Sequence, residues 1–125
     1  MDLIMPDKDE KSKQQLPVAA SRTMTILLGD HNKFEWWIGE KMKTPPTVVN
    51  SYSKQNLRQL LLDKSKEILQ NTGKDMFVII KPSDKSKYNN VVTVMDELNV
   101  VGNQSRAIVD ITPDEIELLK RDGLY

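Results

Sequence analysis

Apolar and polar residues alternate in the first part of the chain, over residues 23–28 and again over residues 34–38. This two-residue period is typical of half-buried β-strands. Between the two runs lies a Gly-Asp-His-Asn cluster at 29–32, whose residues favour turns. The pattern therefore predicts a β-hairpin near the start of the folded part of the chain.

The second strand of this hairpin is rich in aromatic residues. Phe34 and Trp36 fall on one side of the strand together with Ile38, and Trp37 falls on the other side, where it is either half-exposed or covered by the loop that follows. The next segment, 39–53, has no clear period. It is either a long loop or contains a short edge strand near 47–50.

A helical period replaces the alternation after residue 53. Ser53 is a suitable N-cap and Gly73 has the position of a C′ residue, so a helix over 53–71 is predicted. The leucines and isoleucine that recur at helical spacing within it are Leu57, Leu60, Leu61 and Ile68.

Residues 75–111 have the pattern of a βαβ unit. A buried-type strand at 77–80 is followed by a polar turn, an amphipathic helix at about 88–100, a stop at Gly102 and a second apolar strand at 107–111. Such a unit implies a parallel pair of strands with a helix across one face. The predicted inner stripe of the helix is Tyr88, Val91, Val92, Met95 and Leu98, and its predicted outer residues are Asn89, Asn90, Thr93, Asp96 and Glu97.

The chain closes with a further short helix. Thr112 and Glu115 form a capping box with Pro113 at the first helical position, and Gly123 ends the helix. The predicted element order is β-β-α-β-α-β-α. We therefore expect an α+β fold, a small mixed β-sheet with helices packed mainly on one face.

Length and composition favour one domain preceded by a tail. Residues 1–20 carry a mixed charge run and two prolines, as in a flexible tether, and residues 21–125 form the expected domain. The 18 basic and 18 acidic residues balance, so no net charge favours nucleic acid. Cysteine is absent, which excludes a disulfide or a thiolate metal site. No signal peptide or membrane-spanning run is recognisable in the chain.

The sequence predicts no catalytic, cofactor or metal site, and we expect a protein that is not an enzyme. His31 is the only histidine and lies in a turn, so it has no partners for catalysis or metal binding. The five glycines are isolated and form no phosphate loop. The candidate acidic residues are Asp84, Asp96, Asp110 and Asp114. A helix-capping or surface position explains each of them, and Asp84 and Ser86 are alternatives for the same N-cap.

The βαβ segment resembles a known family. Val78-Ile79-Ile80-Lys81, Asp84-Lys85, Tyr88, Val92, Val94-Met95-Asp96-Glu97-Leu98 and Gly102 are similar to the periplasmic domain of the ExbD/TolR family of biopolymer transport proteins. The aromatic hairpin and the Leu-rich helix are also similar, and the resemblance covers about residues 22–111. The chain departs from the family in lacking its membrane helix, in its longer turn with Pro82 and Ser83, in its longer 39–53 loop and in its added last helix.

This resemblance implies a role in an inner-membrane motor driven by the proton gradient. An ExbD-like subunit joins an ExbB-like channel subunit and acts on a TonB-like protein, in support of outer-membrane transport. Its soluble domain forms a homodimer, lies on the periplasmic face of the bacterial inner membrane and acts through protein contacts. The alternative is a TolR-like envelope-integrity module that binds peptidoglycan, and a small enzyme is a third interpretation.

Edge strands of a small sheet commonly recruit another strand, so the hairpin supplies the predicted partner contacts. The opposing interpretation places both tryptophans in the core and at its rim. The predicted contact residues are Ile26, Leu28, Phe34, Trp36 and Trp37, and the family-motif positions are Asp84, Tyr88, Met95, Asp96, Leu98 and Gly102.

Overall fold

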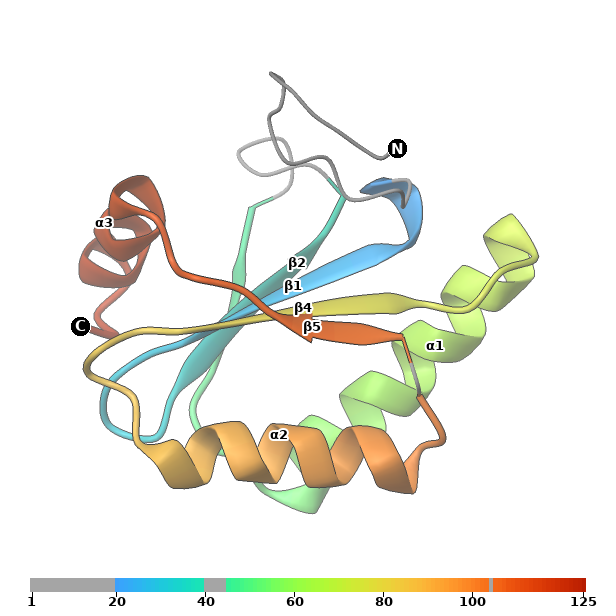
Figure 1. Ribbon diagram of the computed structural model, residues 1–125, viewed down its shortest axis with the longest axis horizontal. Coiled ribbons are helices and arrows are strands. Elements are labelled where there is room, and N and C mark those ends of the chain that lie inside the picture. The colour runs from blue at the N-terminus through green and yellow to red at the C-terminus, as the bar shows by residue number, and fades with distance from the viewer. Residues whose placement is uncertain (1–19, 40–44, 104) are drawn as a thin grey trace, which may run out of the picture.

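The computed structural model describes residues 20–39, 45–103 and 105–125 (Figure 1). They form a five-stranded mixed β-sheet with strand order β3-β2-β1-β4-β5. The predicted α+β class is confirmed. The predicted tether at 1–20 lies outside these ranges except for Ala20.

The elements follow the predicted order with one strand added. The segment after the hairpin contains a short edge strand, which decides between the two alternatives left by the sequence. The elements are η1 (Ala20–Arg22), β1 (Thr23–Leu28), β2 (Phe34–Ile38), β3 (Thr47–Val49), η2 (Lys54–Arg58), α1 (Gln59–Thr72), β4 (Phe77–Pro82), α2 (Tyr88–Val100), β5 (Arg106–Ile108) and α3 (Pro113–Arg121).

Strand β1 lies at the centre of the sheet. It pairs antiparallel with β2 and parallel with β4, and β4 pairs parallel with β5, as the βαβ pattern predicts. All six residues of β1 are buried because both faces of the sheet are covered there. Such two-sided burial explains why the strand reads Thr-Met-Thr-Ile-Leu-Leu, with apolar residues on both faces.

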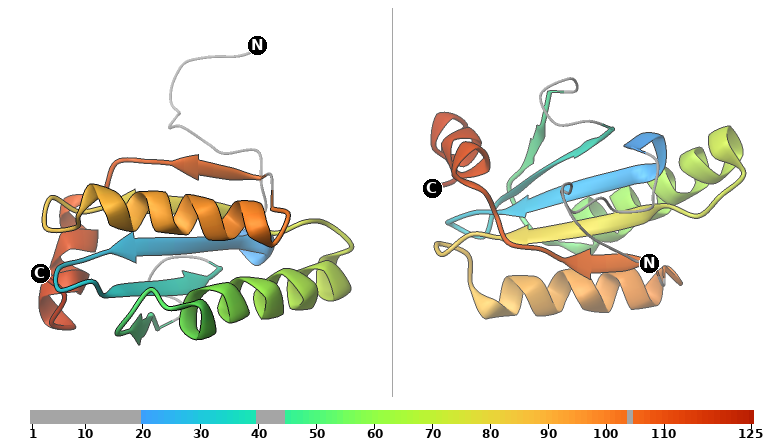
Figure 2. Two further views of the ribbon diagram at one scale, coloured as in Figure 1. Left: turned by 90° about the horizontal axis from the view of Figure 1, so that it is seen from below. Right: turned by 45° about the horizontal axis from the view of Figure 1, so that its top comes forward.

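The larger core lies between the sheet and helices α1 and α2, which run side by side across one face (Figures 1 and 2). Met24, Ile26 and Leu28 from β1 point into it, as alternation along a strand requires. Leu61 of α1 and Leu98 of α2 meet them there, and both are fully buried. This face therefore contains most of the apolar burial that stabilises the domain.

Helix α3 packs on the opposite face, at one end of the sheet (Figure 1). Its Leu118 and Leu119, together with Leu124, enclose Leu27 of β1 and Trp37 of β2. Trp37 is only 3% exposed, and the last helix covers it. Trp37 is therefore not half-exposed, and residues about 80 positions along the chain cover it. The other predicted position, under the following loop, involves residues 40–44, which lie outside the described residues.

Capping contacts are present at several of the predicted helix ends. Gly73 has φ 74° and its N–H donates to the Leu69 carbonyl, as a C′ glycine does. The capping box of α3 is formed, with the Thr112 N–H donating to Glu115 Oε1 at 2.9 Å. Ser53 Oγ accepts from the Asn56 N–H at 3.3 Å, at the start of the π-helical turn η2 that leads into α1.

The predicted inner stripe of α2 is wrong at two positions. Tyr88 is 80% exposed and Val92 is exposed, whereas Asn90 and Glu97, predicted to face solvent, are buried. Asn90 lies inward because its Oδ1 accepts the Lys87 N–H at 3.0 Å. Glu97 lies inward because it forms an ion pair with Arg58 of η2. These polar partners hold Asn90 and Glu97 inward. The buried face of α2 therefore differs from the face that its apolar residues alone predict.

Gly29 allows the C-terminal segment to pass against the β1–β2 turn. A Cβ atom at this position would lie 2.5 Å from the Leu124 carbonyl oxygen and 2.6 Å from its Cβ. We expect Gly29→Ala to displace this segment and lower the free energy of unfolding by about 1–3 kcal/mol, as overpacking does. Urea unfolding measures the change, and an unaltered midpoint would contradict the close approach.

Candidate functional site

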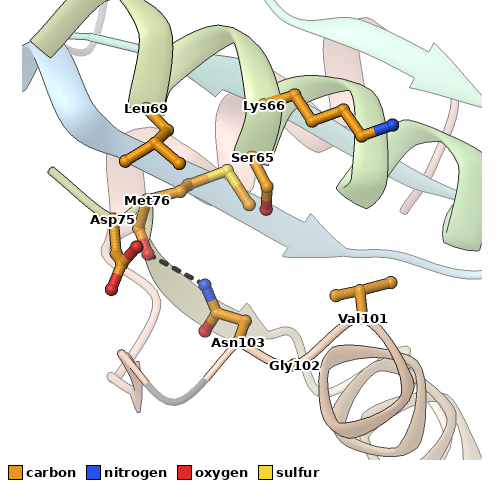
Figure 3. A pocket seen from close by; sticks show the side chains of 8 residues that line it. All are labelled: Ser65, Lys66, Leu69, Asp75, Met76, Val101, Gly102 and Asn103. Carbon is orange, nitrogen blue, oxygen red and sulfur yellow. Dashed lines mark hydrogen bonds between the residues drawn. The ribbon is translucent and has the colours of Figure 1, made fainter. Parts of the chain in front are cut away.

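One shallow cleft opens between α1 and the turn that follows α2 (Figure 3). Its volume of about 180 Å³ is below the range of small-molecule sites. Asn103 is committed to the backbone, since its Nδ2 donates to the Met76 carbonyl at 2.9 Å and its Oδ1 accepts the Ser105 N–H. The cleft is lined by Ser65, Lys66, Leu69, Asp75, Met76, Val101, Gly102 and Asn103.

A metal or histidine site finds no support in the described ranges. No group of three His, Asp or Glu side chains gathers there in a way that would hold a metal ion. His31 is an exposed turn residue with φ 61°, close to Asp30. Within the same ranges, no helix has the length and apolar character needed to cross a membrane.

Strand β5 offers the best-formed surface for a partner. Val78 donates to the Ser105 carbonyl and Val109 donates to the Ile80 carbonyl, both at 2.9 Å. Residues 105, 107 and 109 therefore direct their backbone groups at β4. Because alternate residues of a strand bond to opposite sides, the N–H and C=O groups of Arg106 and Ile108 point away from the sheet. In the part of the chain that the structure describes, no strand lies beyond them.

Helix α2 runs beside this edge. Arg106 donates to the Met95 carbonyl at 3.2 Å and to the Asn99 side chain, which fixes β5 to the helix. Two residues along a strand cover about 6.6 Å, which is slightly more than one helical turn. Since α2 runs antiparallel to β5 (Figure 2), we infer from this spacing that Ile108 lies nearer than Arg106 to the turn of α2 that contains Val92.

These positions form an exposed apolar strip. Ile108 is 54% exposed although its side chain points toward the helix-covered face, because β5 is the last strand there. Val92 and Tyr88 continue the strip along α2 at helical spacing. We refer to Tyr88, Val92 and Ile108, with the outer backbone of β5, as the β5 edge surface.

Four of the five residues predicted to contact a partner are not accessible in the structure. Ile26, Leu28 and Phe34 are fully buried in the larger core, and Trp37 is buried under α3. Trp36 alone is partly exposed, and it packs against the larger core. The physical reason is that β1 and β2 are interior strands. The edges of the sheet are β3 and β5, which the sequence pattern did not identify as partner-facing.

The family-motif positions spread over the β4–α2–β5 segment without converging on one site. Leu98 is buried and Met95 packs partly buried against the core, while Asp96 is exposed and Gly102 has φ 81°. Asp84 is not an N-cap.

The N-cap position of α2 is held by Lys87, so Ser86 is not the cap either. The Asp84 carboxylate instead accepts a hydrogen bond from the Tyr125 hydroxyl at 2.6 Å. The position of the Asp84 carboxylate is therefore determined by Tyr125, which is remote in sequence.

Two partly or fully buried ion pairs were not predicted from the sequence. Arg58 Nε lies 2.6 Å from Glu97 Oε1 and ties η2 to α2. Lys81 Nζ lies 2.7 Å from Glu115 Oε2 and ties β4 to α3. Each pair joins residues more than 30 positions apart, so no local spacing could have indicated it.

No protein-family model matches the sequence, and no curated protein is significantly similar to it. The resemblance to the ExbD/TolR family therefore depends on the motif residues of the sequence alone.

Proposed function

We propose that this chain is a protein-contact domain, the periplasmic domain of an ExbD-like subunit of a proton-driven energy-transduction complex that supports TonB-dependent outer-membrane transport. It acts by docking through the β5 edge surface and is not an enzyme. The observation that carries the proposal is the outer edge of β5, beside which no other strand lies among the described residues, next to exposed apolar residues of α2.

The arrangement of the domain supports this role. An aromatic hairpin, a Leu-rich helix and a βαβ unit occur in the order that the family resemblance implies, and they build one sheet with two helices on one face. An open strand edge supplies main-chain hydrogen bonds to an added strand, and neighbouring apolar side chains supply specificity. An uncovered edge of this kind also tends to pair with other chains unless something blocks it.

A second copy fits this edge geometrically. A two-fold axis at Ala107, perpendicular to the sheet, would pair two β5 strands antiparallel and continue the sheet into the second copy. The same axis would bring the two α2 helices toward each other along Tyr88 and Val92, beside Ile108 of β5. Apolar residues would then be buried on both sides, which is the contact that a homodimer requires.

We expect Ile108→Lys to weaken self-association roughly ten-fold or more, because a charge replaces apolar burial at the centre of the contact. Sedimentation equilibrium over a wide concentration range measures the dimer constant. The matched control is Val48→Lys on the other edge strand, where Val48 has a comparable exposure of 39%. Equal effects of the two substitutions, or a wild-type protein that stays monomeric throughout, would contradict docking at β5.

The family assignment has its own test. The periplasmic segment of the TonB-like protein from the same organism is titrated into the isotope-labelled domain while backbone amide resonances are recorded. We expect shifts along β5 and the adjoining face of α2, and weaker binding by Ile108→Lys than by Val48→Lys. An absence of shifts at saturating concentration would contradict the ExbD-like role even if the domain dimerises.

The cleft beside α1 favours a TolR-like alternative, since polar Ser65, Lys66 and Asp75 line it as sugar and peptide groups would require. In Figure 3 Lys66 extends away from Asp75, so the polar side chains do not converge. Retention of the domain on purified peptidoglycan, lost in Asp75→Ala but not in Ile108→Lys, would favour this alternative over the ExbD-like role.

A further inference from the structure

Glu35 is a carboxyl group buried beneath α3. It is 0% exposed, and as a carboxylate neither of its oxygens has a hydrogen-bond partner. Its cross-strand neighbours are Leu27 on β1 and Val48 on β3, so both adjoining strands present apolar side chains to it. Leu27 and the nearby Trp37 are the residues that α3 covers. A buried ionisable group without a partner requires an explanation, because a charge in such a place is costly.

The charged groups that act on Glu35 within the described residues both come from the end of α3. They are Asp122 and Arg121, whose guanidinium Nε lies 3.0 Å from Asp122 Oδ1. As a neutral acid, Glu35 has an O–H that the Asp122 carboxylate accepts. Burial, this hydrogen bond and the negative charge of Asp122 together raise the pKa of Glu35 to about 8, while Arg121 opposes them. The protonated form is thus the one that fits the folded structure.

The attachment of α3 is limited in extent. Helix α3 and the residues after it contact the rest of the domain through a small apolar cluster around Leu118, Leu119 and Leu124 and through the ion pair from Lys81 to Glu115. The Asp30 N–H also donates to the Leu124 carbonyl at 2.6 Å, and the Tyr125 hydroxyl donates to Asp84. Elements with few buried contacts open most easily without unfolding the rest of a protein. The larger core lies on the other face of the sheet and does not include α3.

We propose that α3 is a proton-dependent cover of the sheet: it stays seated on Leu27 and Trp37 while Glu35 is protonated, and it separates when Glu35 loses its proton to solvent. Ionisation places two negative carboxyl groups, Glu35 and Asp122, face to face, and among the described residues Glu35 has no hydrogen-bond donor for its carboxylate while Arg121 opposes the repulsion only in part. Departure of the helix lets water reach Glu35 and removes Asp122.

Trp37 reports on the cover directly. In a Trp36→Phe background the remaining tryptophan lies under α3, and its emission maximum is followed from pH 6 to pH 9.5. We expect a shift to longer wavelength as the pH rises, with a midpoint at or below about pH 8, because the open form releases the Glu35 proton more readily than the closed form does. Far-ultraviolet circular dichroism should be unchanged apart from the loss of α3. Glu35→Gln, which keeps the shape and cannot ionise, is expected to abolish the transition.

Two neighbouring substitutions change the transition in opposite directions if Glu35 is the group that titrates. Asp122→Asn removes the repelling charge and supplies a donor, so α3 tolerates ionised Glu35 and the transition weakens. Arg121→Gln removes the opposing positive charge, so ionisation displaces α3 more completely. A residue that only maintains the fold would not produce this pair of opposite effects.

The proposal fails if wild-type Trp37 shows no transition in this range, if Glu35→Gln retains it, or if both neighbouring substitutions leave the transition unchanged. Should Glu35→Gln not fold, Glu35→Leu takes its place, because an apolar residue of similar size also removes the charge. We expect this variant to keep Trp37 covered at every pH, and a covered-to-uncovered transition in it would overturn the proposal.

Discussion

Replacing Lys81 by alanine is expected to lower the free energy of unfolding by about 3–5 kcal/mol, because it leaves a buried carboxylate without its cation. Glu115 is 1% exposed in its side chain and Lys81 is 15% exposed. Burial alone would raise the pKa of Glu115, but the hydrogen bonds from Lys81 and from the Thr112 N–H outweigh it and lower that pKa. Chemical denaturation near pH 7 measures the loss.

A double substitution distinguishes the net contribution of the ion pair to stability from the destabilisation caused by removing only one of its partners. Lys81→Met with Glu115→Gln removes both charges, and the glutamine oxygen can still accept the Thr112 N–H that Glu115 accepts now. We expect this double variant to lie within about 1 kcal/mol of wild type, since apolar replacement of a whole buried pair is often neutral. A matched surface control is Glu117→Ala, whose pair with Lys120 is exposed and should contribute at most about 0.5 kcal/mol. A single Lys81 variant as stable as this control would contradict the argument.

The second large effect concerns pH. Glu35 has a folded pKa of about 8 against an ordinary value of 4.5, so the unfolded chain releases this proton earlier than the folded one does. The stability that protonated Glu35 contributes is complete below pH 4.5, declines as the pH rises, and is lost once the pH has passed about 8. The loss amounts to roughly 3–5 kcal/mol, and opening of α3 limits it if the helix separates first.

Glu115 affects stability at the acidic end of the pH range. Its pKa is lowered in the folded state, so its contribution is present above pH 4.5 and is lost as the pH falls below that value. These two groups therefore favour maximal stability near pH 5, below the neutral range. Denaturation measured from pH 4 to pH 9 tests this, with Glu35→Gln as the comparison. A wild-type protein as stable at pH 8.5 as at pH 5, or a Glu35→Gln variant with the same decline, would contradict it.

The β5 edge surface and the face of the sheet under α3 differ in how they are controlled. The β5 edge surface is open in the structure and depends on backbone groups and on Ile108. The face under α3 is covered, and access to it depends on Glu35. A partner of the β5 edge surface should therefore bind with little dependence on pH between 6 and 9, whereas the exposure of Trp37 should increase at the alkaline end.

The sequence by itself determined the element types, most of their boundaries and the fold class. The period of two in β1 and β2, the helical period in α1, the βαβ pattern and the Thr112 capping box were all readable because each reflects contacts within about four residues or one repeated face. The edge strand β3 was left open as one of two alternatives, since three residues are too few to establish a period.

Only the tertiary structure decided which strands are interior, which face of α2 is buried and where the charges lie. Packing of helices α1 and α2 on the sheet turned the predicted partner residues Ile26, Leu28 and Phe34 into core. Glu97 and Asn90 faced inward because Arg58 and the turn before α2 supply their partners. Glu35 beneath α3, Lys81 beside Glu115 and Ile108 at an open edge all depend on segments that are distant in sequence and adjacent in space. Burial and electrostatics act through distance in space, and local spacing along a chain does not report it.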